Sequence, residues 1–214
     1  GIMQSGGSMA NLTALLAGIG DRSDAVAYCS DQTHSSLIRG LSIMGLHPER
    51  VRVLPSDRHQ RIPMDLLRDV IDEDLARGLR PALLIANAGT TNTGAIDPLN
   101  ELADLRDELG CWLHADGAYG VPAAMTSLAR PLFAGLERVD SVVLDPHKWL
   151  FQPYDIACVL VTRPGTLERT FTMNPEYLRD VTAHQGEIDL RNRGPELSRR
   201  GRALKLWLTV RTYG

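Results

Sequence analysis

Residues 141–151 read SVVLDPHKWLF and join an apolar run to a polar cluster. The first five residues are typical of a buried β-strand. Asp145, His147 and Lys148 stand at its end, and the chain turns apolar again at Trp149. A lysine in this position is either a surface side chain whose stem packs on apolar groups or an amine held at a strand end for chemistry.

Strand-like and helix-like patterns alternate along the chain. The strand-like runs cover residues 25–29, 51–54, 81–87, 111–116, 141–145 and 157–162. Residues 35–45, 63–78 and 98–110 carry apolar side chains at helical spacing, and the last two segments begin with Pro and end with Gly. This alternation predicts an α/β fold with a mostly parallel central sheet and helices on both faces. The connection between Lys148 and Ala157 is too short for a crossover helix, so we expect the last two strands to be antiparallel.

The composition is that of an ordinary globular domain. The 214 residues are 43% hydrophobic and 23% charged, and the formal net charge is −3. A mildly acidic chain lacks the basic field that binding to nucleic acid or to a membrane surface requires. Cys29, Cys111 and Cys158 lie in or beside apolar runs, which is typical of buried thiols in a reduced protein. With no signal peptide and no membrane-spanning run, the sequence predicts a cytoplasmic protein.

Polar clusters follow four of the predicted strands. They are SDQTH (30–34), AGTT (88–91), HAD (114–116) and DPHK (145–148). Ligands of parallel α/β sheets bind at the carboxyl ends of the strands. The four clusters therefore predict one shared pocket.

The segment SGGSMANLTALLAG, residues 5–18, predicts a helix behind a glycine-rich turn. Gly6 and Gly7 allow a tight turn, and we expect Ser8 to cap the helix. The free N–H groups and the positive end of the helix dipole would then form a seat for a phosphate. A capped helix without a ligand fits the same residues equally well.

Two kinds of site can be built from these clusters. His114 and Asp116 stand two apart on one strand and so face the same side. A metal site would need more ligands, and the spacing of His34, His114, Asp116 and His147 matches no standard metal motif. A pyridoxal-phosphate site explains more, because it needs a lysine amine, an aspartate for the ring nitrogen, an imidazole for the ring face and a helix N-terminus for the phosphate.

Six segments, in this order, resemble the motifs of a known family. They are SGGSMAN, SDQTHSS, GTTNTGAIDP, HADGAYG, DPHKW and NPEYL. They resemble the group II pyridoxal-phosphate-dependent amino acid decarboxylases, and most of all the aromatic-L-amino-acid decarboxylases. The resemblance implies that residues 1–214 form part of the large, cofactor-binding domain of a fold-type I enzyme, without the N-terminal arm and the small C-terminal domain. It also implies an amino acid substrate and a homodimer with the active site at the subunit interface.

The resemblance also implies the reaction, which is decarboxylation of an L-amino acid to its amine through a Schiff base on Lys148 and a quinonoid intermediate protonated from Tyr177. Further catalytic roles fall to Asp116 at the ring nitrogen and to His34, stacked on the ring beside the substrate. For cofactor binding it adds Gly7, Ser8, Thr91, Ala118 and His147. Tyr177 lies in residues 165–195, whose weak periodicity predicts a mobile catalytic loop.

Plain structural explanations exist for several of these residues. Asp116 can cap a turn, His34 can precede a helix, Thr91 can be a turn residue and Tyr177 a surface side chain. Another fold-type I enzyme, such as an aminotransferase or a carbon–carbon lyase, and an inactive truncated fragment are the alternative functions.

Three positions depart from the family's common pattern. Asp145 stands where asparagine is frequent, Met9 where glutamate is common and Gly117 where alanine is. A carboxylate near a phosphate would be repelled by it. We therefore expect Asp145 to accept backbone hydrogen bonds or to turn away.

Overall fold

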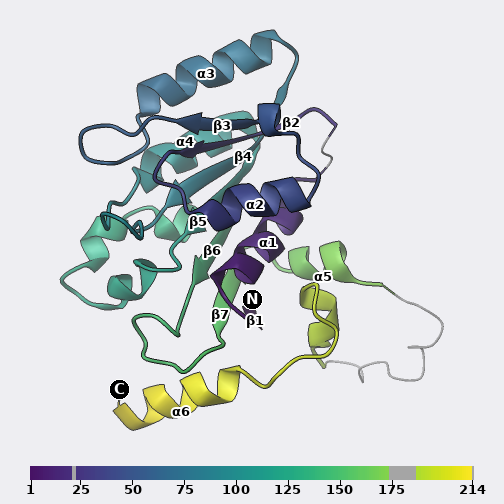
Figure 1. Cartoon of the computed structure of the whole chain (residues 1–214), viewed down its shortest axis with the longest axis vertical. Helices are drawn as coiled ribbons and strands as arrows, with labels where there is room; N and C mark the ends of the chain where they lie inside the picture. The colour runs from purple at the N-terminus through teal and green to yellow at the C-terminus, as the bar shows by residue number, and fades with distance from the viewer. Residues whose placement is uncertain (21–22, 174–186, 214) are drawn as a thin grey trace.

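The computed structural model describes residues 1–20, 23–173 and 187–213 (Figure 1). Within these residues, seven strands form one sheet in the order β1-β7-β6-β5-β4-β2-β3. The strands are β1 (Ile2–Gln4), β2 (Ala25–Ser30), β3 (Val51–Leu54), β4 (Arg80–Asn87), β5 (Trp112–Asp116), β6 (Ser141–Leu144) and β7 (Ala157–Val161). The neighbours from β3 to β6 pair in parallel, whereas β7 is antiparallel to both β6 and β1. The predicted mostly parallel sheet and antiparallel last pair are confirmed.

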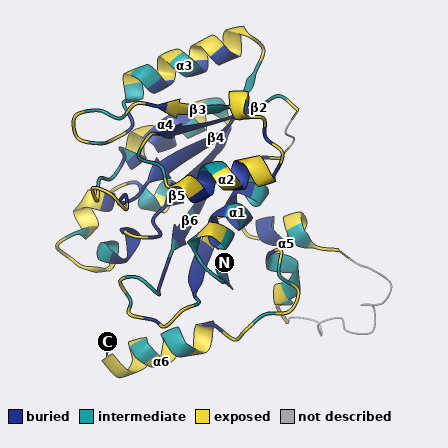
Figure 2. Ribbon diagram, viewed as in Figure 1, coloured by how far each residue is buried: buried dark blue, intermediate teal, exposed yellow. Residues whose placement is uncertain are grey.

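Helices cover both faces of this sheet, as predicted. One face carries α1 (Gly7–Gly18) and α2 (Ser35–Ile43), and the other carries α3 (Met64–Ala76) and α4 (Leu99–Leu109). Side chains of β2 alternate between the two layers, because successive residues of a strand point to opposite faces. Ala27 and Cys29 pack with α1 and α2, and Val26 and Tyr28 pack with α3 and α4. Figure 2 shows the sheet as a buried layer between them.

The remaining helices lie beside the layers formed by α1 to α4, and three of them contribute buried core residues, namely Val121, Phe133 and Leu167. These remaining helices are α5 (Thr166–Phe171) and α6 (Ala203–Tyr213), with short 3-10 helices at η1 (Pro48–Arg50), η2 (Val121–Met125), η3 (Arg130–Phe133), η4 (Leu136–Arg138) and η6 (Leu190–Arg193). The predicted loop of residues 165–195 thus begins with α5, which contacts α1. Tyr177 lies outside the described residues. Among the residues described, no helix is both long and apolar enough to cross a bilayer.

The register of the sheet aligns the predicted strand ends. Asn87 at the end of β4 is paired with Asp116 at the end of β5, and Asp116 is paired with Val143 of β6. The carboxyl ends of three adjacent strands therefore form one edge. The polar residues that follow them share that edge with the first turns of α1 and α2.

Candidate active site

Lys148 lies in the turn that follows β6. Its backbone N–H donates to the Asp145 carbonyl at 2.9 Å, which closes the turn. Its Nζ lies 2.9 Å from Oδ2 of Asp145, and the Lys148 side chain is 31% exposed while that of Asp145 is only 3% exposed. The amine is therefore held at the protein surface by a buried carboxylate and does not extend into bulk solvent.

Asp116 is a buried carboxylate at the end of β5. Its Oδ1 accepts the Ala118 N–H at 3.1 Å, and its Oδ2 accepts Nδ2 of Asn11 at 3.4 Å. Burial raises the pKa of Asp116, while the Ala118 N–H and the charges of Lys148 and His34 act in the opposite direction. A carboxylate that is costly to ionise in its own surroundings gains most from a cationic partner.

A chain of buried hydrogen bonds ends on Asp116. The Trp112 indole N–H donates to Ser141 Oγ at 2.9 Å, and that hydroxyl lies 2.8 Å from Nδ1 of His114. Nε2 of His114 lies 3.0 Å from Oδ1 of Asn11, whose amide nitrogen faces Asp116. His114 and Asp116 thus share one face, as their spacing predicts. Asn11 and Ser141 were not predicted as site residues. A polar asparagine among the apolar positions of residues 5–18 is the one sequence signal that could have indicated Asn11.

His34 is the N-cap of α2. Its Nδ1 accepts the Ser36 N–H at 3.3 Å and lies 2.8 Å from the Ser36 hydroxyl oxygen. That hydroxyl oxygen also accepts Nδ2 of Asn11 at 3.4 Å. The helix-capping explanation of His34 therefore holds, and the same contacts place its exposed ring one hydrogen bond away from the network of Asp116.

The first turn of α1 differs from the prediction in one respect. Gly6 occupies the N-cap position and Gly7 is already helical, so the exposed Ser8 does not cap the helix. The prediction that Ser8 caps was wrong because the extended Gly6 lets the helix begin ahead of it. A side chain at Gly7 would collide with the protein, since its Cβ would lie 2.7 Å from Oδ2 of Asp145.

Asp145 is turned into the protein, contrary to expectation. It does not turn away, and among the described residues no backbone N–H donates a hydrogen bond to its carboxylate. Its Oδ2 pairs with Lys148, while Oδ1 is buried and has no hydrogen-bond partner among the described residues. Nε2 of His147 lies 3.5 Å from the same Oδ2.

His147 is fixed by its own contacts. Its side chain is buried, its Nδ1 accepts the Ile156 N–H at 3.3 Å, and its ring stacks on Tyr154 with 4.4 Å between centroids. Its Cε1 would lie 3.9 Å from a Cβ added at Gly6. His147 is thereby placed beside the start of α1, where the sequence predicts a phosphate.

Ala118 and Thr91 have different surroundings. Ala118 is buried in a cluster with Ala10 and Ala14 of α1. Thr91 is exposed in the turn after β4, whereas the neighbouring Thr90 is buried and its Oγ1 lies 2.7 Å from that of Thr93. The structure therefore places Ala118 against α1 and in contact with Asp116. Thr91 lies at the exposed margin of the sheet edge that the ends of β4, β5 and β6 form.

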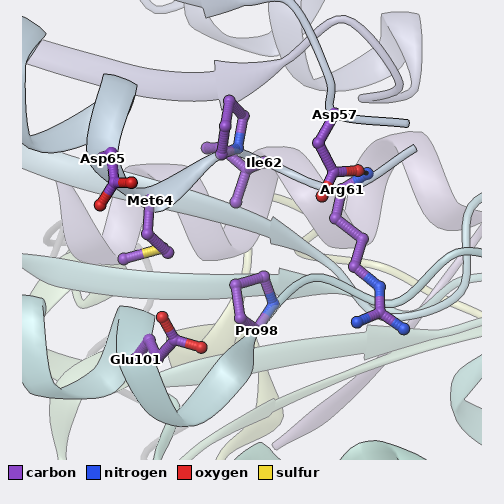
Figure 3. Close-up of a pocket in the computed structure, with 8 residues that line it drawn as sticks. Asp57, Arg61, Ile62, Met64, Asp65, Pro98 and Glu101 are labelled. Carbon is purple, nitrogen blue, oxygen red and sulfur yellow. Dashed lines mark hydrogen bonds between the residues drawn. The ribbon is translucent and has the colours of Figure 1, made fainter. Parts of the chain in front are cut away.

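A separate hollow of about 370 Å³ lies between the loop around Asp57 and Arg61 and the first turns of α3 and α4 (Figure 3). Met64, Asp65, Pro98 and Glu101 line it from the two helices, and it contains none of the predicted site residues. Within the described part of the chain, no three His, Cys, Asp or Glu side chains are grouped to hold a metal ion.

Burial of His114 makes a prediction about stability. Burial lowers the pKa of His114 to about 3, whereas in the unfolded chain its value is 6.5. Below pH 6.5 the unfolded state takes up a proton that the folded state refuses, so the free energy of unfolding falls as the pH falls toward 3. Between pH 6.5 and 5 this one residue should lower the free energy of unfolding by about 1.6 kcal/mol. Urea unfolding of wild type and His114→Gln across that range should show the smaller loss in the variant.

His47→Gln is the matched control, because the His47 side chain is 69% exposed. It should leave the pH dependence of the unfolding free energy at the wild-type value. Equal pH slopes for wild type and His114→Gln would contradict the neutral, buried state of His114.

The chain is similar to known proteins over its whole length. The family model described as the pyridoxal-dependent decarboxylase conserved domain matches residues 1–214. An aromatic-L-amino-acid decarboxylase of Bacillus atrophaeus is 48% identical over the whole chain, which spans 46% of that relative. A phenylacetaldehyde synthase of a Rosa hybrid cultivar is 40% identical over 88% of the chain, which corresponds to 38% of that protein.

Solved structures show the same fold. The Oryza sativa TDC with PLP and tryptamine superposes with a TM-score of 0.92 at 31% identity, covering the whole chain and 46% of that structure. The Catharanthus roseus tryptophan decarboxylase in complex with L-tryptophan gives a TM-score of 0.89 at 33% identity, again over the whole chain and 46% of that structure. The chain spans about half the length of these relatives. With every residue matched by the family model, the chain belongs to the pyridoxal-dependent decarboxylase family.

Proposed function

We propose that the protein decarboxylates an L-amino acid to the corresponding amine with pyridoxal 5′-phosphate as cofactor. The observation that supports this most directly is the pair of Lys148 and Asp116, an amine and a buried carboxylate at the ends of adjacent strands in a chain that the family model matches throughout. When bound, the cofactor supplies an electron sink for the electron pair that departing carbon dioxide leaves behind.

The residues present fit this cofactor. Burial raises the pKa of Asp116 because it makes the charged carboxylate unfavourable. A positive charge on a nearby ring nitrogen offsets that cost, so Asp116 is suited to keep such a nitrogen protonated. Asn11 and the Ala118 N–H fix both oxygens of Asp116, so its direction is set by the protein. Lys148 supplies an amine whose surroundings keep it near the same edge of the sheet.

Each candidate site residue has a proposed task. Lys148 would bind the cofactor's aldehyde group, and Asp116 would hold the proton at its ring nitrogen. His34 would cover one ring face and Ala118 the other, while Gly7, Ser8 and His147 would bind the phosphate and Thr91 would contact the cofactor. Tyr177, by resemblance to the family, donates the proton to the substrate carbon.

Product analysis tests the reaction. The full-length protein, supplied with the cofactor and a panel of aromatic and other L-amino acids, should release carbon dioxide and amine in equal amounts from at least one of them. Tyr177→Phe should keep the cofactor's visible absorption but lose amine formation. Full amine yield from that variant would remove Tyr177 from the mechanism.

Aldehyde formation is the second candidate, because a relative 40% identical to the chain is named a phenylacetaldehyde synthase. The same experiment separates the reactions. Aldehyde in place of amine would assign the synthase reaction, and a keto acid without carbon dioxide would assign an aminotransferase. No product from any amino acid would contradict both the decarboxylase and the synthase.

We also propose a homodimer in the cytoplasm. Exposed aromatic side chains support a covered surface: Phe151 is 91% exposed, Tyr154 80% and Trp207 of α6 59%. The three cysteines are buried and free, which suits a reducing compartment. Sedimentation of the full-length protein tests the dimer, and a monomer at micromolar concentration would exclude it.

A further inference from the structure

The carboxylate of Asp145 lies where the proposed phosphate site begins. Both of its oxygens would lie within about 3 Å of a Cβ at Gly7, at 2.7 Å for Oδ2 and 3.1 Å for Oδ1. Gly7 is the first residue of α1, so this carboxylate stands against the first turn of the helix. A helix N-terminus attracts negative charge, whether it comes from a ligand or from the protein's own side chain.

The two oxygens of Asp145 are not equally satisfied. Oδ2 lies 2.9 Å from Nζ of Lys148 and 3.5 Å from Nε2 of His147. Oδ1 is buried and accepts no hydrogen bond among the described residues, although the residue is only 2% exposed. A buried oxygen without a donor is costly, so this arrangement is kept at the expense of stability.

These contacts link the phosphate seat to the amine. A negatively charged phosphate at the first turn of α1 would meet the Asp145 carboxylate at close range, and like charges at such distances repel strongly. The same carboxylate holds the Lys148 side chain in place, because its Oδ2 lies 2.9 Å from Nζ of Lys148. Moving Asp145 away would relieve the repulsion and also free the lysine from its partner.

We propose that Asp145 is a positioning residue that competes with the cofactor's phosphate for the first turn of α1. Its carboxylate holds Lys148 in an ion pair until the phosphate displaces the carboxylate. This inference rests on the proposed function, since it assumes that the cofactor binds at Lys148. According to this proposal the charge of Asp145 weakens cofactor binding, an effect that an uncharged asparagine at this position would not have.

The test compares pyridoxal phosphate with pyridoxal, which has the same aldehyde and ring but no phosphate. Cofactor is removed from the full-length protein, and each compound is titrated back while its absorption and the tryptophan fluorescence are recorded. Asp145→Asn keeps the size of the side chain and removes its charge. We expect it to tighten binding of pyridoxal phosphate by about tenfold, and that of pyridoxal by less than about twofold.

Asp74→Asn is the matched control. Asp74 is also buried and ion-paired, with Arg52, but it lies on α3. The Asp74→Asn substitution removes the same charge away from the site. It should leave the ratio of the affinities for pyridoxal phosphate and pyridoxal unchanged. Asp145→Ser takes the place of Asp145→Asn if the latter does not fold, as judged by circular dichroism.

The ratio of the two affinities decides the proposal. A gain below about threefold in preference for pyridoxal phosphate over pyridoxal would overturn it, whether both affinities rise together or neither does. Equal gains would show that Asp145 acts on the lysine alone. Failure of the proposed function gives a different result, because the wild-type protein would then form no Lys148-dependent absorption with pyridoxal phosphate at all.

Discussion

Replacing Lys148 with alanine is expected to abolish the visible absorption of the lysine-linked cofactor and to lower decarboxylation by roughly a thousandfold or more, as loss of a covalent or proton-transferring group does. Residues 1–214 contain one other lysine, Lys205 of α6, and its Nζ is bonded to the carbonyls of Pro153 and Asp155 at 2.6 and 3.1 Å. Absorption spectra and turnover of the purified variant check this expectation.

Lys205→Ala is the matched control for this experiment. It removes the other amine of these residues and should keep both the absorption band and the turnover, provided that the variant folds. An unchanged band in Lys148→Ala would show that the cofactor is attached elsewhere.

Asp116→Asn is expected to retain the fold but to lower turnover by on the order of a hundred- to a thousandfold, the range found when one preorganised electrostatic group is removed from an active site. The amide oxygen can still accept the Ala118 N–H, but an amide cannot balance a positive charge on a ring nitrogen. The variant should therefore bind the cofactor, and its turnover number should fall much more than its apparent substrate affinity.

A second measurement separates this electrostatic role from a structural one. Asp116→Glu keeps the charge, so it should recover part of the activity and of the wild-type absorption maximum that Asp116→Asn loses. Wild-type turnover in Asp116→Asn would mean that the carboxylate only closes the turn after β5.

Much of the fold could be predicted because its strands and helices carry strong local patterns. The six predicted strands correspond to β2 to β7, and the almost fully buried apolar runs of β2, β4 and β5 are what a parallel sheet covered on both faces requires. β1 was missed because three residues at an edge are too few to show a period. It forms through pairing with β7, a contact between residues more than 150 positions apart that no local pattern reveals.

Candidate site residues were predictable only where an unusual residue type stands at the end of a predicted strand. Lys148 and Asp116 stand at strand ends and carry unusual groups for their surroundings, so the sequence could single out both as candidates. Asn11 was not predicted, because its contact with Asp116, 105 positions away, depends on how α1 packs across β5. The contacts of Asp145 were predicted wrongly for a related reason, since its ion pair depends on the conformation of the turn after β6.

The central claim is that the cofactor is attached to the amine of Lys148. Borohydride reduction of the full-length protein with bound pyridoxal phosphate, followed by mass-spectrometric peptide mapping, tests it most directly. We predict a stoichiometric pyridoxyl adduct on the peptide that contains Lys148 and none on Lys205. An adduct on any other residue, or no adduct from a protein that decarboxylates amino acids, would contradict the claim.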